Sequence, residues 1–229
     1  RWAEGRSRFD FFLLRTAGVD PETGDQLFLL YEQDENGESV PVRNADGSIQ
    51  TTNDWQETER AYTGDSSIPD LLGSVANSFR YKGFNLDFLI TYGIGGSVLD
   101  NAYSSLMHSG AYGNSLHPDI LNAWRQPGDI TDVPRLENGN PNLVRTQSER
   151  FLTDASFWSL KNVNLGYNFD NNTTEALGLD DLRISLTGEN LYLKSERKGL
   201  DPQYNLAGTP PGDDFSPPRI VSLGLNLSF

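Results

Sequence analysis

The chain has 229 residues and is acidic, with 32 Asp and Glu against 18 Lys and Arg and a formal net charge of −14. Nucleic-acid phosphates are bound by clustered Lys and Arg, so this balance argues against a nucleic-acid partner. With no Cys and only two His, the chain has no disulfide or thiolate metal site, and a transition-metal site is disfavoured. No apolar run approaches the ~20 residues of a membrane-spanning helix.

The first 31 residues predict a strand, a turn and a second strand. Apolar segments at 9–14 and 26–31 flank a turn-rich segment at 17–25. Residues 32–66 are acidic and polar, with tight-turn signals at Asn36-Gly37 and Asp46-Gly47. We expect an exposed loop or hairpin there.

Residues 71–92 form the clearest hairpin of the sequence. Lys82-Gly83 separates two runs in which apolar residues occupy every second position, with Asn77 as an exception. Because Asp87 lies among apolar neighbours, its face of the strand must be hydrated or paired.

Regular alternation stops between residues 93 and 155, where Gly, Asn, Ser and Pro are frequent. The only plausible helix in this stretch is 118–124. So long a connection is unusual in a compact domain and is usually functional or disordered.

Alternation returns at 156–169 and 182–189, and after a loop at 194–218 it returns in the last strand, 219–229. One face of that strand is apolar and the other is small and polar, as expected where one face meets lipid and the other water. A soluble sandwich shows the same period of two, so the pattern alone does not decide between them. The apolar face carries Val221, Leu223, Leu225, Leu227 and Phe229.

About seven strands alternate with short turns and with long loops at 32–66, 93–155 and 194–218. This is the organisation of an all-β, antiparallel transmembrane β-barrel with periplasmic turns and external loops. So few strands do not close such a barrel. We therefore expect residues 1–229 to be the carboxyl-terminal part of a larger barrel domain, as a fragment or a processed product.

Several segments resemble the SusC/RagA family of TonB-dependent outer-membrane transporters. They occur in the order found in that family and span nearly the whole chain: A-G-V-D-P-E-T-G-D at 17–25, N-S-F-R-Y-K-G-F at 77–84, T-D-V-P-R at 131–135, R-F-L at 150–152 with L-K-N-V-N-L-G-Y at 160–167, G-E-N-L at 188–191, G-L-D-P at 199–202 and P-R at 218–219.

The resemblance implies a plugged barrel of about 22 strands, of which this chain is roughly the last third. It implies import of oligomeric nutrients, glycan or peptide, through the outer membrane of a Gram-negative bacterium. The implied partners are the rest of the barrel and its plug domain, a SusD-like surface lipoprotein acting as a lid, outer-membrane lipid, and TonB through an amino-terminal part absent from these residues.

Two groups of residues are candidates for contact with cargo. Loop side chains that suit sugar stacking or peptide clamping serve equally well to pack the loop or to meet the lipoprotein: Tyr103, His108, Tyr112, His117, Trp124 and Arg125. Charged residues on polar strand faces either line a hydrated lumen or pair with one another and with a plug, and pairing is favoured: Asp87, Lys161, Arg183 and Glu189.

We expect no catalytic site and no cofactor. Gly64-Asp65-Ser66 resembles an esterase motif, but neither His follows an Asp by three residues, as a Ser-His-Asp arrangement of that type requires. Calcium at Asp34-Glu35-Asn36 or Asp213-Asp214 is an alternative, although the spacing matches no EF-hand and turns favour Asp and Asn anyway.

Two other classes of protein stay open. One is a structural or adhesive outer-membrane barrel that does not transport, which the presence or absence of a plug in the parent protein separates from an importer. The other is a soluble β-sandwich binding module, which detergent dependence separates from both barrels because the apolar strand faces would be exposed to water.

Overall fold

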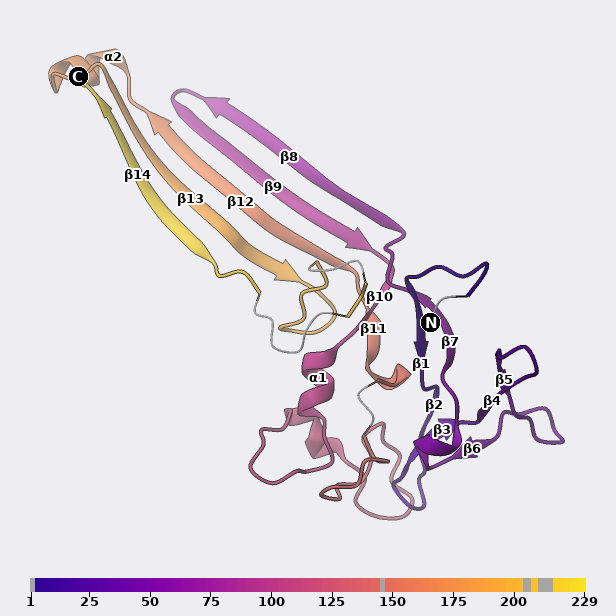
Figure 1. Cartoon of the computed structure of the whole chain (residues 1–229). Coiled ribbons are helices and arrows are strands. Elements are labelled where there is room, and N and C mark those ends of the chain that lie inside the picture. The colour runs from indigo at the N-terminus through magenta and orange to yellow at the C-terminus, as the bar shows by residue number, and fades with distance from the viewer. Residues whose placement is uncertain (1–2, 145–146, 204–206, 210–215) are drawn as a thin grey trace. The chain divides into compact units, whose positions relative to one another are not determined.

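The computed structural model describes residues 3–144, 147–203, 207–209 and 216–229. The chain forms two compact units, both visible in Figure 1. The first contains residues 1–68, 96–154 and 203–214, and the second contains residues 69–95, 155–202 and 215–229. The long connection predicted at 93–155 therefore lies in the first unit, except for residues 93–95 and 155 at its two ends.

The second unit is a five-stranded antiparallel sheet. Its five long strands lie side by side in the order in which they occur in the chain (Figure 1): β8 (Leu71–Tyr81), β9 (Phe84–Ile94), β12 (Phe157–Asn168), β13 (Asp181–Lys194) and β14 (Ile220–Ser228). The strands predicted at 71–92, 156–169, 182–189 and 219–229 are confirmed, and β13 extends beyond its predicted end.

The strand registers place every second residue of each strand on one face across all five strands, and the register shift of β12 between Leu160 and Asn162 reverses the parity along that strand. Leu86 of β9 faces Phe79 of β8 on one side and Leu165 of β12 on the other. The same row continues through Leu186 of β13 to Leu223 of β14. The period-two pattern of each strand therefore adds up to one apolar face and one polar face.

The β8–β9 turn needs two residues with positive φ. Lys82 has φ 45° and Gly83 has φ 84°, as in a two-residue type I′ hairpin turn. A Cβ atom at Gly83 would lie 2.6 Å from the carbonyl oxygen of Asn168, so space as well as conformation requires glycine here. This turn defines one end of the sheet, which we call the turn end.

The connection from β12 to β13 lies at the same end and contains α2 (Asn171–Ala176). The Asp170 carboxylate accepts the Thr173 N–H at 2.8 Å and caps this helix, which lowers the pKa of Asp170. The segment between the strands predicted at 156–169 and 182–189 thus contains a short helix, and the Asp170 cap satisfies one of its free N–H groups.

Irregularities on β12 and β13 lie opposite each other. The β12–β13 register shifts between Leu160 and Asn162, which leaves Lys161 out of the pairing. On β13, Asn190 has φ 50°, and its side-chain amide donates to the Pro218 carbonyl at 3.4 Å. The G-E-N-L segment therefore forms a β-bulge, a feature that increases local strand twist.

The first unit contains several small sheets. Antiparallel pairs join β1 (Asp10–Leu13) to β7 (Ala61–Ser66), β4 (Tyr31–Gln33) to β5 (Ser39–Pro41) and β10 (Ser97–Leu99) to β11 (Leu152–Asp154), and a three-stranded sheet contains β2 (Thr16–Val19), β3 (Gln26–Leu29) and β6 (Thr51–Thr52). The helices are η1 (Trp55–Glu57), α1 (Asn101–Leu106), η2 (Pro118–Asn122) and η3 (Glu149–Phe151).

The large sheet thus has five strands rather than the seven counted from the sequence. The two amino-terminal strands exist, but β1 pairs with β7, a strand within the predicted loop at 32–66, and β3 pairs with β2 and β6. Phe11 and Leu13 of β1 are buried. These segments therefore bury their apolar side chains in the first unit.

The core of the first unit joins residues from three distant stretches of the chain: Phe11, Leu13, Leu99, Met107, Ile120, Ala123, Val133 and Phe151. The connection at 93–155 is therefore packed, and its predicted helix is the short 3-10 helix η2. Among the described residues, no helix is both long enough and apolar enough to cross a membrane.

The hairpin turn can be tested by two neighbouring substitutions in the full-length parent protein. Gly83→Val should reduce the folded fraction, because a β-branched residue is strained at positive φ and its Cβ would approach the Asn168 carbonyl. Lys82→Asn should fold normally, since Asn tolerates positive φ. Heat-dependent gel mobility after refolding measures both, and equal folded fractions would contradict this account of the turn.

Candidate functional site: a two-faced sheet and a tied loop junction

The sheet carries an apolar face that the described chain does not cover. Leu223 is 77% exposed, Leu225 60% and Val75 47%. These residues align with Phe79, Leu165, Ile184 and Leu186, which are also exposed. An apolar surface that continues across five strands is rare on a soluble monomer and marks contact with protein or lipid.

Aromatic residues border this face at both ends. At the turn end the Phe84 and Tyr167 ring centroids are 4.5 Å apart, and Phe169 lies 4.9 Å from Tyr167. At the opposite end, which we call the loop end, Trp158 lies 4.8 Å from Tyr192. Amphipathic rings at both borders of an aliphatic band are the pattern of a membrane-spanning barrel wall.

The spacing of the two aromatic rows fits a bilayer. Trp158 and Tyr167 are nine residues apart on β12, which corresponds to roughly 30 Å along an extended strand. A strand tilt of about 40° reduces this to a height of about 23 Å, close to the ~25 Å apolar band of outer-membrane barrels.

The other face of the sheet is polar and makes its own contacts. The Ser78 hydroxyl donates to the Asp87 carboxylate at 2.5 Å. Arg183 lies beside Gly166, where a Cβ atom would be 3.0 Å from its guanidinium. Two buried oxygens on this face, Oγ1 of Thr91 and Oδ1 of Asn164, have no hydrogen-bond partner among the described residues.

The four charged residues predicted for the lumen are not brought together. By register, Asp87, Arg183 and Glu189 lie on the polar face. Lys161 lies in the β12 bulge, where alternation does not assign a face. Within the described part of the chain, no ion pair joins any two of the four. Their exposure to a lumen stays a prediction.

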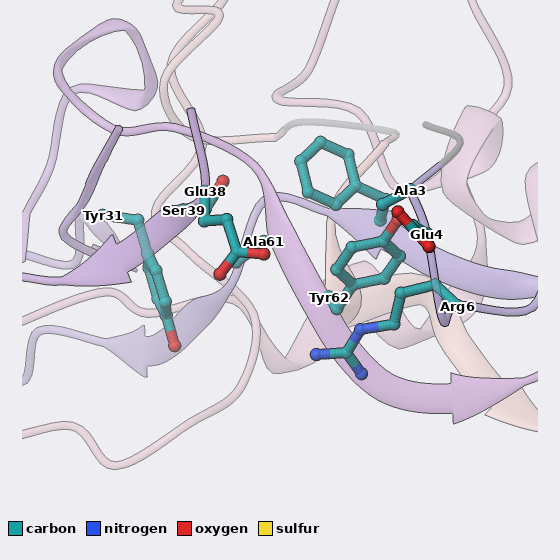
Figure 2. Close-up of a pocket in the computed structure, with 9 residues that line it drawn as sticks. Ala3, Glu4, Arg6, Tyr31, Glu38, Ser39, Ala61 and Tyr62 are labelled. Carbon is teal, nitrogen blue, oxygen red and sulfur yellow. The ribbon is translucent and has the colours of Figure 1, made fainter. Parts of the chain in front are cut away.

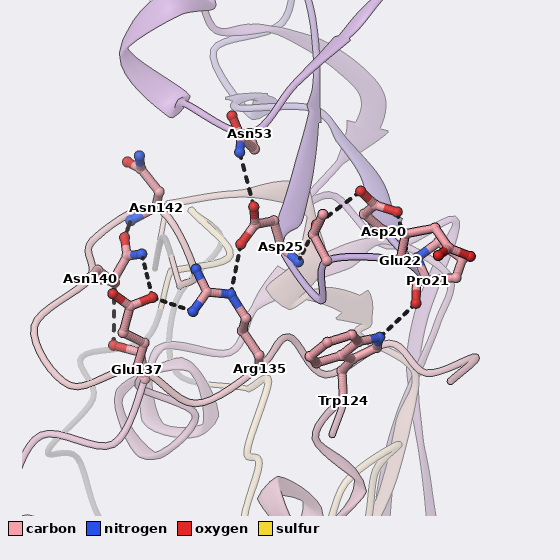
Figure 3. A network of polar contacts seen from close by, with 12 residues as sticks. Asp20, Pro21, Glu22, Asp25, Asn53, Trp124, Arg135, Glu137, Asn140 and Asn142 are labelled. Atoms are coloured by element: carbon pink, nitrogen blue, oxygen red, sulfur yellow. Dashed lines mark hydrogen bonds and ion pairs between the residues drawn. The ribbon is translucent and has the colours of Figure 1, made fainter. Parts of the chain in front are cut away.

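In the first unit, the A-G-V-D-P-E-T-G-D segment forms a tied turn (Figure 3). Asp20 accepts hydrogen bonds from the Glu22 N–H and the Thr23 hydroxyl, both at 2.9 Å. The Pro21 carbonyl accepts the indole N–H of Trp124 at 2.8 Å. At Gly24, with φ 74°, any Cβ would collide with the Trp124 ring. The segment therefore has a structural role: it positions Trp124 against the turn.

An ion-pair network completes this junction (Figure 3). Arg135 contacts the Asp25 carboxylate at 2.9 Å and also pairs with Glu137, while Asn53 donates to Asp25 at 3.0 Å. Burial alone would raise the pKa of Asp25, but the bonds from Asn53 and Arg135 outweigh it and lower the pKa below its usual value.

Of the predicted loop residues, three pack within the first unit. The Tyr103 hydroxyl donates to Asp119 at 2.8 Å, and its ring lies 4.8 Å from the His117 ring. His117 caps η2 by accepting the Asp119 N–H. Trp124 is held by Pro21 and Gly24, as described above. These three side chains are engaged in packing the loop.

The other three predicted residues do not share one site. His108 accepts the N–H groups of Gly110 and Ala111 through Nδ1, and Arg125 donates to the Leu121 carbonyl. Tyr112 is 97% exposed. The structure therefore does not assemble the six residues into a single binding surface, and Tyr112 is the most accessible of them.

A pocket that no sequence pattern indicated lies in the first unit (Figure 2). Its walls bring Arg6 and Tyr62 together with Tyr31, and Arg6 lies 4.7 Å from the centre of the Tyr62 ring. The volume is about 170 Å³, and the lining is Ala3, Glu4, Arg6, Phe12, Tyr31, Glu38, Ser39, Ala61 and Tyr62. Its residues come from five separate segments, so no local motif marks it.

The acidic candidates for calcium have structural explanations where they are described. The Asp34 carboxylate accepts the N–H groups of Asn36 and Glu38 and so closes a tight turn. Asp213-Asp214 lies outside the described residues. No group of three His, Cys, Asp or Glu within the described ranges is placed to hold a metal ion.

The Asp25 ion pair predicts a loss of order at low pH. Because its pKa is lowered in the folded state, ionised Asp25 stabilises the junction above its ordinary pKa of 3.8, and this contribution disappears as the pH falls through the lowered value. Hydrogen exchange of residues 20–25 and 133–137, corrected for intrinsic rates, should increase below that pH. Asp25→Asn should exchange faster already at pH 7, and unchanged protection in this variant would contradict the assignment.

Comparison with known proteins supports one relationship. The chain is 28% identical over 208 residues to TonB-dependent receptor P3 of Formosa agariphila, a match that covers 86% of this chain and 19% of the relative. It is 27% identical over 221 residues to TonB-dependent receptor SusC of Bacteroides thetaiotaomicron, covering 88% of this chain and 19% of the relative. No protein-family model matches the chain.

Solved structures agree with the sequence matches. The RagAB peptide importer in its closed-closed state superposes with a TM-score of 0.75 at 25% identity, covering 96% of this chain and 23% of that one. The RagAB peptide transporter gives a TM-score of 0.74 at 26% identity with the same coverage. The chain thus spans about one fifth of its curated relatives, and over most of its length it is similar to one part of TonB-dependent receptors such as SusC and to the RagAB peptide importer.

Proposed function

We propose that the chain forms part of the membrane wall and external loops of an outer-membrane, TonB-dependent importer of oligomeric nutrients. One observation carries the proposal: the uncovered face of the five-stranded sheet is an aliphatic band between two aromatic rows, and the opposite face is polar. Lipid contact on one face and a hydrated interior on the other account for both.

The activity belongs to the whole parent protein, since this chain matches only 19% of its curated relatives. We expect the plug domain and the segment that contacts TonB to lie in the remainder of that protein. A SusD-like surface lipoprotein is expected to act as the lid over the external loops. The relatives are receptors and transporters, which supports a non-enzymatic role.

The cargo is a glycan or a peptide. RagAB is a peptide importer by its description, and the first unit offers a pocket with two Tyr rings, two Glu and one Arg. Such groups stack on sugar rings or hydrogen-bond a peptide backbone. The pocket supports cargo contact but does not distinguish between the two classes.

The esterase alternative finds no support at Gly64-Asp65-Ser66. Ser66 lies in β7, where it pairs with Asp10 of β1 in the antiparallel ladder. A nucleophilic Ser requires a base within hydrogen-bond reach, and the side-chain hydrogen bonds and ion pair that the structure describes for His108 and His117 lie within residues 108–119.

Adjacent residues of β14 test the membrane assignment. Leu225→Arg places a charge on the lipid-facing side and should destabilise the folded parent protein by about 2–4 kcal/mol near the bilayer midplane. Asn226→Arg places the same charge on the polar face and should cost much less. Folding titrations into phospholipid vesicles measure both, and equal losses would refute the assignment of faces.

The importer role is tested by extraction of the full-length protein from outer membranes in mild detergent, followed by mass spectrometry and uptake assays. Recovery with a surface lipoprotein, and loss of oligomer uptake when the gene is deleted, are the expected results. A barrel recovered without a plug, with uptake unaffected by deletion, would favour the structural or adhesive alternative.

A further inference from the structure

A basic cluster lies at the loop end of the sheet, although the chain as a whole carries a net charge of −14. It surrounds a cavity of about 460 Å³ whose lining includes Tyr192 and Asn190. Four of the lining residues are cationic and one is acidic: Lys194, Arg197, Lys198 and Arg219, with Glu196. The local charge is thus opposite in sign to that of the chain.

Most of these cations are available to a ligand. Lys194, Lys198 and Arg219 are exposed. Within the described ranges, none of the three forms an ion pair. Their charge is therefore not neutralised by the side chains that the structure describes.

Two of the cations, Lys194 and Arg219, lie on the face that carries the aliphatic band. Lys194 pairs in register with Trp158, two residues beyond Tyr192 on the same strand. Arg219 immediately precedes β14 and shares the parity of Val221. Lys and Arg at such positions lay their aliphatic stems along the apolar surface and extend the charged group into the polar layer.

The two ends of the sheet differ in how their cations are arranged. At the turn end, the Lys82 ammonium lies 5.2 Å from the Tyr81 ring. The neighbouring β12–β13 connection is acidic, with Asp170, Glu175 and Asp180. Both ends have an aromatic row, and among the described residues the loop end combines that row with a cavity lined by several cations. Membrane depth alone does not explain this asymmetry, whereas an anionic layer at one surface does.

We propose that this basic cluster binds the phosphate-bearing headgroup of an outer-leaflet lipid, with Lys194 and Arg219 as the principal contacts. Arg binds phosphate through two parallel hydrogen bonds and Lys as a point charge. The adjacent Trp158 and Tyr192 rings lie at the depth where acyl chains meet headgroups. The inference rests on the proposed function, since it requires the apolar face to contact lipid.

Native mass spectrometry of the full-length protein in detergent tests the inference, with diphosphorylated lipid A and zwitterionic phosphatidylcholine as probes. The wild type should retain lipid A in preference to phosphatidylcholine. Lys194→Gln with Arg219→Gln should weaken lipid A retention by about tenfold or more. Retention of both lipids to the same extent by the wild type would overturn the proposal.

A matched control removes the same charge elsewhere on the sheet. Arg80→Gln with Lys82→Gln lies at the turn end and should leave lipid A retention unchanged. Equal losses in the two double variants would show that only net charge matters and would overturn the site. Inorganic phosphate should not displace lipid A at equal concentration; if it does, the cluster binds soluble phosphate and the lipid assignment is wrong.

Heat-dependent gel mobility of each variant separates this inference from the proposed function. A folded barrel that shows no lipid A preference refutes the basic site alone. A protein that forms no barrel in detergent refutes the membrane assignment itself.

Discussion

A strand that crosses a bilayer must have its backbone N–H and C=O groups hydrogen-bonded within the protein, because hydrocarbon offers no partner. In the sheet, β9, β12 and β13 meet this condition on both sides, while β8 and β14 each pair on one side within this chain. With the proposed membrane assignment, the two outer edges need strands from the rest of the parent protein. This agrees with a match to about one fifth of the curated relatives.

How much of the fold could be predicted from the sequence depends on how local each structural feature is. Period-two alternation is local, so the five long strands β8, β9, β12, β13 and β14 could be located from the sequence. The bulge at Lys161 and Asn190 was missed because it depends on how two strands meet. The small sheets of the first unit were missed for a similar reason: β1 pairs with β7 about fifty residues later, and short segments carry little signal about such partners.

The motifs that carried the family resemblance form turns, ion pairs and a bulge that hold the structure together. Asp20 and Gly24 shape the turn that receives Trp124, Val133 is buried in the core beside the ion-paired Arg135, and Asn190 forms the bulge that reaches Pro218. The motifs could be identified from the sequence, but the contacts of their residues could not. The pocket of Figure 2 had no such signal, since its lining comes from five separate segments.

The long-range ion pairs of the first unit have a consequence for the order of assembly. Arg15 pairs with Glu149 at 2.5 Å, and Asp25 pairs with Arg135. In both pairs the two residues are more than a hundred positions apart in the sequence, whereas the β8–β9 hairpin closes over a two-residue turn. Local contacts form faster than distant ones. The β8–β9 hairpin is thus expected to form first in the sheet, and the ion pairs of the first unit are expected to form last.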